Sequence, residues 1–283
     1  MPATDVDVDD PADPRLVDYR SLTDSDLRVR HEEAAGVFIA EGPLVVRELI
    51  ASAYDVRSVL VNAGQRSALA DVLDELDAPV YVASQRVIDS VAGFHLHRGA
   101  LACGRRRTEP AVDDLLSDDL VAGAGLVAVL ERVNDHENLG ALYRNARALG
   151  VDAVVLCPEC CDPLYRRSVR VSMGHVLHVP TARVPSTAEA ISALRARGFT
   201  VVALTPQDDA EPVDVLRDPA LGPVALLIGA EGPGLRPETI AGADRRVRVP
   251  MSDGVDSLNV ATAAAIAFHE VGHSRQLTAE GIR

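Results

Sequence analysis

The segment GAEGPGL (229–235) is the first candidate for a binding site, because it holds three glycines within six residues. It follows a short apolar run, Val224 to Ile228, which predicts a buried strand. Glycine permits positive φ angles and lets the main chain approach a ligand closely. The segment lacks the Lys of a P-loop and the G-x-G-x-x-G spacing of a dinucleotide site. It therefore indicates a ligand loop of another kind, with a plain connecting loop as the alternative.

A second segment, NLGALYRNARALG (138–150), follows a predicted strand at 126–130 and ends at a glycine, as helices often do. Asn138 then stands at the helix start, where Asn is a favoured cap, and Arg144 lies one to two turns further along. Such an Arg also suits a merely solvated helix face. The carboxylate of Glu231 is costly inside the glycine-rich loop without a partner, so we expect it to pair with Arg144 or to accept from a backbone amide.

The third segment, VPMSDGVDSLNVATAAA (249–265), leads into the last predicted helix, which we expect to start near Ser257. Ser is a suitable N-cap residue for that helix. Two other clusters look like metal sites but are incomplete. CPECC (157–161) has no second pair of ligands, and His95 and His97 have no third ligand nearby. We therefore expect no metal.

The chain is acidic, with 28 basic residues, all of them Arg, against 42 Asp and Glu and a formal net charge of −14. Nucleic-acid-binding proteins usually carry a basic surface, so the total charge argues against such a partner. The charges are uneven, however, because eight Asp crowd the first 30 positions while arginines cluster at 105–107, 166–170 and 245–248. Local basic patches keep RNA binding possible and predict a strong salt dependence.

Helix and strand alternate along the chain, which predicts an α/β fold. We expect a disordered acidic tail at 1–20, a smaller α/β domain over 21–104, a linker at 105–125 and a second α/β domain over 126–275. Nearly continuous apolar strands in the second domain indicate a parallel sheet covered on both faces. The sequence has no apolar run long enough to span a bilayer and no signal-peptide core, so we expect a cytoplasmic protein.

Taken together and in this order, the three segments resemble the three motifs of the SpoU/TrmH family of RNA 2'-O-ribose methyltransferases, in the SPOUT superfamily. The segment 30–50 resembles the substrate-binding domain of family members, which has a fold similar to ribosomal protein L30e. The resemblance covers about residues 21–275 and implies S-adenosylmethionine as methyl donor. It also implies a trefoil knot in the C-terminal domain, a rare exception to unknotted topology. The implied partners are RNA, ribosomal rather than transfer, and a second copy of the chain, so that both chains build each site.

The resemblance also implies roles for particular residues. The matching catalytic residues are Arg144, Asn138, Glu231, Ser257 and Asn259. The matching cofactor contacts are Gly229, Val249 and Leu258, with Thr205 at the end of its strand. The implied RNA contacts are Arg30, Arg47, Arg98, Arg166 and Arg170. The run NDHEN before the second segment departs from the family pattern, because Glu137 places an acid beside the expected RNA site.

Transfer to a ribose 2'-hydroxyl requires that the hydroxyl lose its proton. The family proposal makes the Arg the base, but a guanidinium keeps its proton up to about pH 12, so a phosphate near the target is the alternative acceptor. Arg144 would then position the groups electrostatically.

Four other functions compete with this interpretation. Two are methyltransferases, one acting on tRNA and one conferring antibiotic resistance through rRNA. The others are a non-catalytic RNA-binding assembly factor and a generic α/β nucleotide binder.

Overall fold

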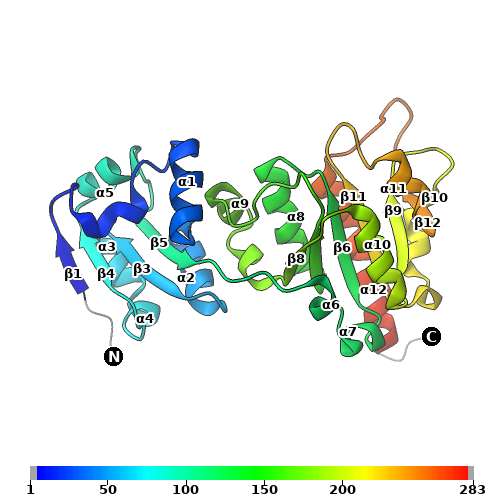
Figure 1. Ribbon diagram of the computed structural model, residues 1–283, viewed down its shortest axis with the longest axis horizontal. Coiled ribbons are helices and arrows are strands. Elements are labelled where there is room, and N and C mark those ends of the chain that lie inside the picture. Colours follow the sequence, from blue (N-terminus) through cyan, green and yellow to red (C-terminus); the bar gives the residue numbers. More distant parts are fainter. Residues whose placement is uncertain (1–4, 280–283) are drawn as a thin grey trace. The chain divides into compact units, whose positions relative to one another are not determined.

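The computed structural model describes residues 5–279, which divide into two compact units (Figure 1). Unit 1 comprises the described residues up to Thr108 and the later segment Pro163–His178. Unit 2 comprises Glu109–Asp162 and the described chain from Val179 onward. Each unit is built of helices around one β-sheet, which confirms the predicted α/β class. Within residues 5–279, no helix is both long and apolar enough to cross a membrane.

Unit 1 holds a mixed five-stranded sheet in the order β1-β4-β3-β5-β2. β1, β4 and β3 run parallel to one another, and β5 is antiparallel to both β3 and β2. The elements of unit 1 are β1 (Asp5–Val8), η1 (Pro14–Tyr19), α1 (Ser25–Ala35), β2 (Val37–Glu41), α2 (Pro43–Ala51), β3 (Val56–Val61), α3 (Ala63–Ala68), α4 (Ala70–Leu73), β4 (Val80–Ala83), α5 (Gln85–Ala92), β5 (Ala100–Arg105), α9 (Arg166–Val171) and η2 (His175–His178).

Unit 2 holds a seven-stranded sheet in the order β10-β12-β9-β11-β6-β7-β8, with every pairing parallel. The elements of unit 2 are α6 (Val112–Leu115), α7 (Asp118–Ala122), β6 (Leu126–Glu131), α8 (His136–Ala148), β7 (Ala153–Leu156), β8 (Thr181–Arg183), α10 (Thr187–Ala196), β9 (Thr200–Leu204), β10 (Glu211–Pro212), η3 (Val213–Arg217), η4 (Pro219–Leu221), β11 (Val224–Gly229), α11 (Pro237–Ala241), β12 (Arg245–Arg248) and α12 (Val260–Ala279).

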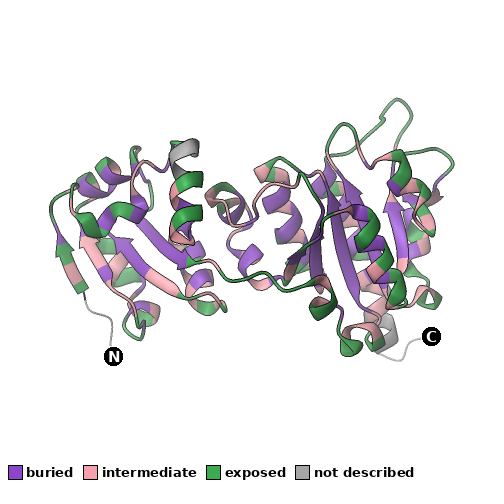
Figure 2. Cartoon of the chain, viewed as in Figure 1, coloured by how far each residue is buried: buried purple, intermediate pink, exposed green. Residues whose placement is uncertain are grey.

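The central strands of unit 2 are buried along their whole length. Every residue of β6, β7 and β11 is buried, as Figure 2 shows in purple. Such strands need a cover on both faces of the sheet, and α10 packs against β9 while α12 packs against β11 and α8. Because all strands run parallel, the carboxyl ends of β6, β9, β11 and β12 meet at one edge of the sheet.

The prediction of a disordered tail at 1–20 is wrong for the described part of that segment. Residues Asp5–Val8 form β1, which pairs with β4, and η1 follows. Leu16 and Tyr19 are fully buried in the core of unit 1, and the hydroxyls of Tyr19 and Ser58 share a hydrogen bond of 2.7 Å. The few apolar residues between the aspartates therefore outweigh the acidic composition.

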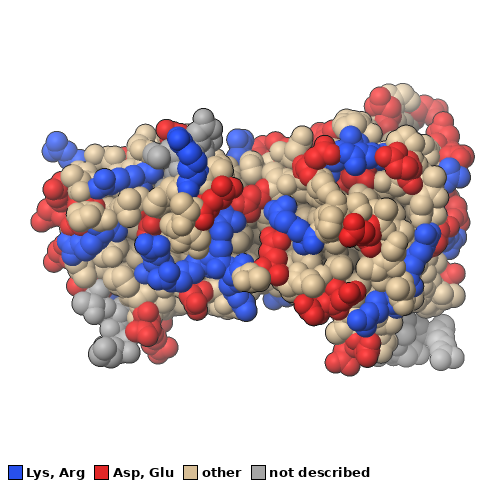
Figure 3. Space-filling view, viewed as in Figure 1, with Lys and Arg blue, Asp and Glu red and all other residues tan. Residues whose placement is uncertain are grey.

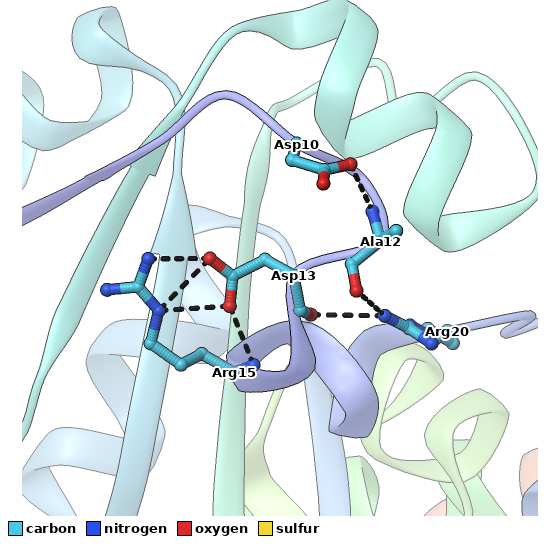
Figure 4. Close-up of polar contacts among 5 residues, drawn as sticks. All are labelled: Asp10, Ala12, Asp13, Arg15 and Arg20. Atoms are coloured by element: carbon cyan, nitrogen blue, oxygen red, sulfur yellow. Dashed lines mark hydrogen bonds and ion pairs between the residues drawn. The ribbon is translucent and has the colours of Figure 1, made fainter.

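Short polar contacts fix the turn that leads into η1 (Figure 4). The carboxylate of Asp13 accepts from the backbone N–H of Arg15 at 2.8 Å and from its guanidinium at 2.6 Å. Arg20 donates to the carbonyl of Ala12 at 2.6 Å. The Arg15 contacts hold the pKa of Asp13 at about 2, below its ordinary value. The aspartates of this segment thus cap and order it.

The segment predicted as a linker, 105–125, also differs from the expectation. It contains α6 and α7, and Leu116 is fully buried in the core of unit 2. A second difference is that Pro163–His178 belongs to unit 1, where α9 packs against β2. A charge run and closely spaced glycines indicated an irregular segment. Packing against the core of unit 2 instead orders part of this segment as short helices.

We predict that Leu16→Ala destabilises the protein by about 2–5 kcal/mol, because it opens a cavity in a packed core. Val17→Ala is the matched control, since Val17 is 41% exposed in the same 3-10 helix. Urea unfolding followed by circular dichroism measures both variants. Equal unfolding free energies would show that the N-terminal segment is not part of the core.

Candidate active site

A pocket of about 120 Å³ opens at the carboxyl edge of the unit 2 sheet. Its position beyond the strand ends is where ligands bind in open parallel sheets. Its lining includes the four residues predicted to contact a cofactor and two of those predicted to act in catalysis, namely Gly229, Thr205, Val249, Leu258, Glu231 and Ser257.

The main chain folds back on itself at Gly229. A Cβ atom at this position would lie 2.2 Å from the carbonyl carbon of Gly234 and 2.2 Å from the backbone nitrogen of Leu235. Ala230 and Gly234 form an isolated β-bridge, and Gly234 has a φ of 65°. Only glycine fits such a crossing of two backbones. Gly229 is therefore required for the loop to close on itself. The closed loop forms one wall of the pocket.

A chain of hydrogen bonds joins the three motifs. The Asn138 side-chain amide donates to the Glu231 carboxylate at 2.5 Å. The Asn259 amide donates to the Asn138 Oδ1 atom at 2.8 Å. Asn138 belongs to α8, Glu231 lies in the glycine-rich loop, and Asn259 is the residue directly before α12. The side chains of three distant segments thus have fixed orientations beside the pocket.

Two predicted helix caps are wrong. The N-cap of α8 is Asp135, whose carboxylate accepts from the backbone N–H of Asn138 at 2.8 Å. Asn259 caps α12, because its Oδ1 atom accepts from the backbone N–H of Ala261 at 3.0 Å. Asn138 is thereby free to use its amide for Glu231, and Ser257 lies exposed in the segment before α12. Glu231 pairs with Asn138 instead of the expected Arg144 or backbone amide.

Arg144 stands apart from this chain of hydrogen bonds. Six residues separate it from Asn138, so the two side chains leave α8 about 120° apart around the helix axis. Arg144 is exposed and has no hydrogen bond or ion pair with any residue between 5 and 279. Its neighbour Asn145 instead donates to the carbonyl of Ala261 at 2.9 Å and so joins α8 to α12. A free guanidinium on the helix surface can engage a second molecule.

The arginines predicted to contact RNA lie in different surroundings within unit 1. Arg30 and Arg98 are exposed, and Arg47 pairs with Asp71 at 2.6 Å. Arg166 is largely buried, with its side chain 14% exposed, and it pairs with Glu41 and donates to the carbonyl of Leu22 at 3.0 Å. Arg170 also donates to Glu41, at 3.1 Å, but its side chain is 43% exposed. Arg166 is therefore held by the protein, while Arg98 and Arg170 present charge to solvent.

Two residues at the end of β6 hold the glycine-rich loop, and sequence reasoning missed both. Glu131 is 1% exposed, and its carboxylate accepts from the hydroxyls of Thr187 at 2.8 Å and Thr239 at 2.5 Å and from the backbone N–H of Arg236 at 2.7 Å. Arg132, with a φ of 57°, donates to the carbonyl of Gly234 at 3.1 Å. An acid directly after a continuous apolar strand was the signal that could have revealed this clamp.

The cysteines of 157–161 are poor metal ligands as they stand. Burial raises the pKa of the Cys157 and Cys161 thiols to about 12. A metal ligand must be a thiolate, so these thiols stay protonated at neutral pH. Among residues 5–279, no group of three or more His, Cys, Asp or Glu side chains is arranged to hold a metal ion.

This fold and site define a class of protein, namely a parallel α/β domain that binds a small molecule beside a cluster of amides and one carboxylate. Residues 125–269 match the SpoU rRNA Methylase family. The chain is 48% identical over 265 residues to a protein of Mycobacterium bovis named as an uncharacterized tRNA/rRNA methyltransferase, covering 93% of this chain and 90% of that protein. The chain belongs to the SpoU rRNA Methylase family and is an RNA methyltransferase.

Two further likenesses extend over most of the chain. The 23S rRNA (guanosine-2'-O-)-methyltransferase RlmB of Vibrio cholerae is 30% identical over 226 residues, covering 78% of this chain and 89% of RlmB. A crystal structure of an AdoMet-bound rRNA methyltransferase from Sinorhizobium meliloti has a TM-score of 0.76 and 28% identity, covering 94% of this chain and 97% of that one. Both units therefore take part in the likeness.

We predict that Glu131→Gln lowers the free energy of unfolding by about 1–3 kcal/mol, because the new amide N–H₂ replaces an oxygen that accepts hydrogen bonds in a buried site. Glu238→Gln, an exposed change in α11 of the same unit, is the control. Urea unfolding compares the two variants. A Glu131→Gln protein as stable as the control would show that the clamp on the loop is dispensable.

Proposed function

We propose that this protein transfers a methyl group to the 2'-hydroxyl of a ribose in RNA, and that the RNA is ribosomal. The observation that carries the proposal is the chain from Asn259 through Asn138 to Glu231, because it joins the three motifs at the rim of one pocket. The RlmB relatives, named for 2'-O-methylation of 23S rRNA, support ribosomal RNA over transfer RNA.

The pocket suits S-adenosylmethionine, the ligand of the Sinorhizobium meliloti structure. Its walls combine apolar side chains such as Leu204, Ile228 and Leu258 with backbone from the glycine-rich loop. Apolar walls with few polar groups are usual for a site that takes a nucleoside-like ligand. When bound, S-adenosylmethionine supplies an activated methyl group on a positively charged sulfur. The residues of this chain orient the acceptor and assist the loss of its proton.

The hydrogen-bonded pair of Asn138 and Glu231 orients the acceptor, and the unpaired Arg144 assists the loss of its proton. Glu231 and Asn138 hold each other in place and present hydrogen-bonding groups at the pocket rim, so they orient the ribose hydroxyl at little further cost in freedom. Arg144 contributes a permanent positive charge. This charge stabilises the alkoxide that develops as the hydroxyl loses its proton, and it holds a neighbouring phosphate, which accepts the proton.

Arg144 has no partner among the described residues of its own chain, which leaves it available to a second copy. We propose a homodimer in which Arg144 of one chain completes the pocket of its partner. The exposed position of Arg144 and the absence of Arg144 from the hydrogen-bond chain support this arrangement. Closed two-fold dimers are the commonest oligomers, and such symmetry would build two identical sites.

Three further features belong to the proposal. Unit 1 serves as an L30e-like RNA-binding domain, which its mixed sheet and its exposed Arg98 and Arg170 support. The chain from β12 through the 249–259 segment to α12 forms a trefoil knot, which the approach of that segment to the glycine-rich loop supports. The protein works in the cytoplasm, where its ribosomal substrate is assembled.

The charge of unit 1 suits an RNA partner better than the charge of unit 2 does. It carries 15 Arg against 18 acidic residues, whereas unit 2 carries 13 Arg against 24 acidic residues. Figure 3 shows arginines spread over the drawn face of unit 1. The near balance of charge lowers the repulsion of phosphates there.

Gly229→Ala is predicted to abolish binding of S-adenosylmethionine, because the added methyl group collides with the backbone of Gly234 and Leu235. Gly64→Ala is the control, since a Cβ there meets its nearest atom at an ordinary 3.5 Å. Isothermal titration calorimetry measures the affinity of both variants. If Gly229→Ala binds like the control, the glycine-rich loop is not a wall of the donor site.

Arg144→Ala is predicted to lower kcat of methyl transfer about 10²-fold or more with unchanged donor affinity, because it removes charge stabilisation during the reaction. Arg147→Ala, an exposed arginine one turn further along α8, is the control. Full activity of Arg144→Ala would remove this residue from the site.

Mixed dimers test whether Arg144 acts on the partner's site. Arg144→Ala and Glu231→Ala chains are co-expressed with different affinity tags, and both homodimers are inactive if each residue is essential. Roughly a quarter of wild-type activity should return on mixing, because half of the dimers are mixed and each contains one complete site. No recovery would place Arg144 and Glu231 of the same chain in one site.

A further inference from the structure

We propose that unit 1 contains a second pocket that binds one unstacked nucleotide of the RNA substrate. The pocket has a volume of about 540 Å³ and lies between the start of α2, the loop after α5 and the end of α9. The identity of its ligand rests on the proposed function, since RNA is the partner that the family acts on. The pocket itself adds a base-binding role that the arginine contacts alone do not provide.

The walls of this pocket are apolar. Leu44, Val45, Phe94, Leu96 and Met173 line it. Leu44 is 51% exposed, whereas Val45, Val46 and Leu49 of the same helix are buried. A nucleobase has apolar faces and binds to such surfaces once it has left its stack. The exposed leucine therefore marks a surface that a flat ring can cover.

The rim of the pocket is cationic. Arg98 is exposed and has no hydrogen bond or ion pair with any residue in the described part of the chain. Arg170 also lines the pocket and keeps its side chain 43% exposed. Glu41 is the one acidic residue in the lining, and Arg166 and Arg170 share it. Two arginines facing one neutralised acid leave a net positive charge, as a phosphate requires.

The aromatic side chains of the pocket are held in fixed orientations. The Arg166 guanidinium lies 5.3 Å from the centre of the Phe94 ring, and Arg166 is itself fixed by Glu41. The Nδ1 atom of His95 donates to the Asp89 carboxylate at 2.7 Å, and the His95 ring meets the ring of His97 edge to face with 4.7 Å between the ring centres. His97 is exposed and also lines the pocket. An aromatic rim beside the unpaired guanidinium of Arg98 and the partly exposed guanidinium of Arg170 favours a base with its phosphate over an acidic peptide, which would leave the apolar walls uncovered.

The protein contains no Trp, so one introduced Trp reports on the pocket without background. Leu44→Trp places the reporter in the pocket, and Val17→Trp, at a residue 41% exposed outside the lining, is the matched control. The probe is single-stranded oligoadenylate, compared with an RNA duplex of equal length and with oligoglutamate. The donor and the methyl acceptor are not needed, so the result is independent of whether methylation is detected.

We expect oligoadenylate to quench the fluorescence of Leu44→Trp in a saturable way and to leave Val17→Trp unchanged. Adding Arg98→Ala to the Leu44→Trp protein should weaken the affinity roughly ten-fold, because a phosphate contact is lost. The duplex and oligoglutamate should quench little. Equal quenching of both reporters, an affinity left unchanged by Arg98→Ala, or equal quenching by oligoglutamate would each overturn the proposal.

A second measurement avoids any change in the pocket. Single-stranded RNA that contains 4-thiouridine is photo-crosslinked to the unsubstituted protein, and the attached peptides are mapped by mass spectrometry. The proposal expects crosslinks in the peptides that carry Leu44 and Phe94, with loss of those crosslinks in Arg98→Ala. Crosslinks confined to other parts of unit 1 would contradict a base-binding role for this pocket.

Discussion

The structure of the site depends on one close approach of the main chain to itself. At Gly229 the backbone passes so near to Gly234 and Leu235 that no side chain fits. This crossing closes the glycine-rich loop, and the closed loop both walls the pocket and holds Glu231 at its rim. Two residues at the end of β6 hold this crossing in place, because Arg132 donates to the carbonyl of Gly234 and Glu131 accepts from the backbone N–H of Arg236, just after the loop.

The parallel sheet supplies the second requirement, namely that distant segments meet. The carboxyl ends of β6, β9, β11 and β12 lie at one edge of the sheet, and the segments that follow β9, β11 and β12 line one pocket there. The start of α12 then reaches α8 through Asn259 and Asn138. Because Asn259 is also the cap of α12, the geometry of that helix end and the geometry of the site are set by the same side chain.

Much of this arrangement was predictable from the sequence. The predictions that failed did so for identifiable physical reasons. Continuous apolar runs predicted β6, β9 and β11, and the glycine spacing predicted the pocket wall, because local pattern and burial agree there. Composition misled at the N-terminus, where a few buried side chains order an acidic segment. The caps were assigned to Asn138 and Ser257 from residue type alone, although Asp135 and Asn259 are equally good caps and tertiary contacts decided between them. The acid at the end of a continuous apolar strand marks Glu131 as unusual, but the local pattern does not identify its partners, because the threonines that donate to it lie more than fifty residues away.

The most direct test of the account is the transfer of tritiated methyl from S-adenosylmethionine to total RNA isolated from cells that lack this protein. The products are separated by size, and the labelled nucleosides are identified by mass spectrometry. The account predicts label in the large ribosomal RNAs, carried on ribose 2'-oxygens, with the label lost in the Arg144→Ala protein. Label on bases, or no label although the protein binds S-adenosylmethionine, would contradict it.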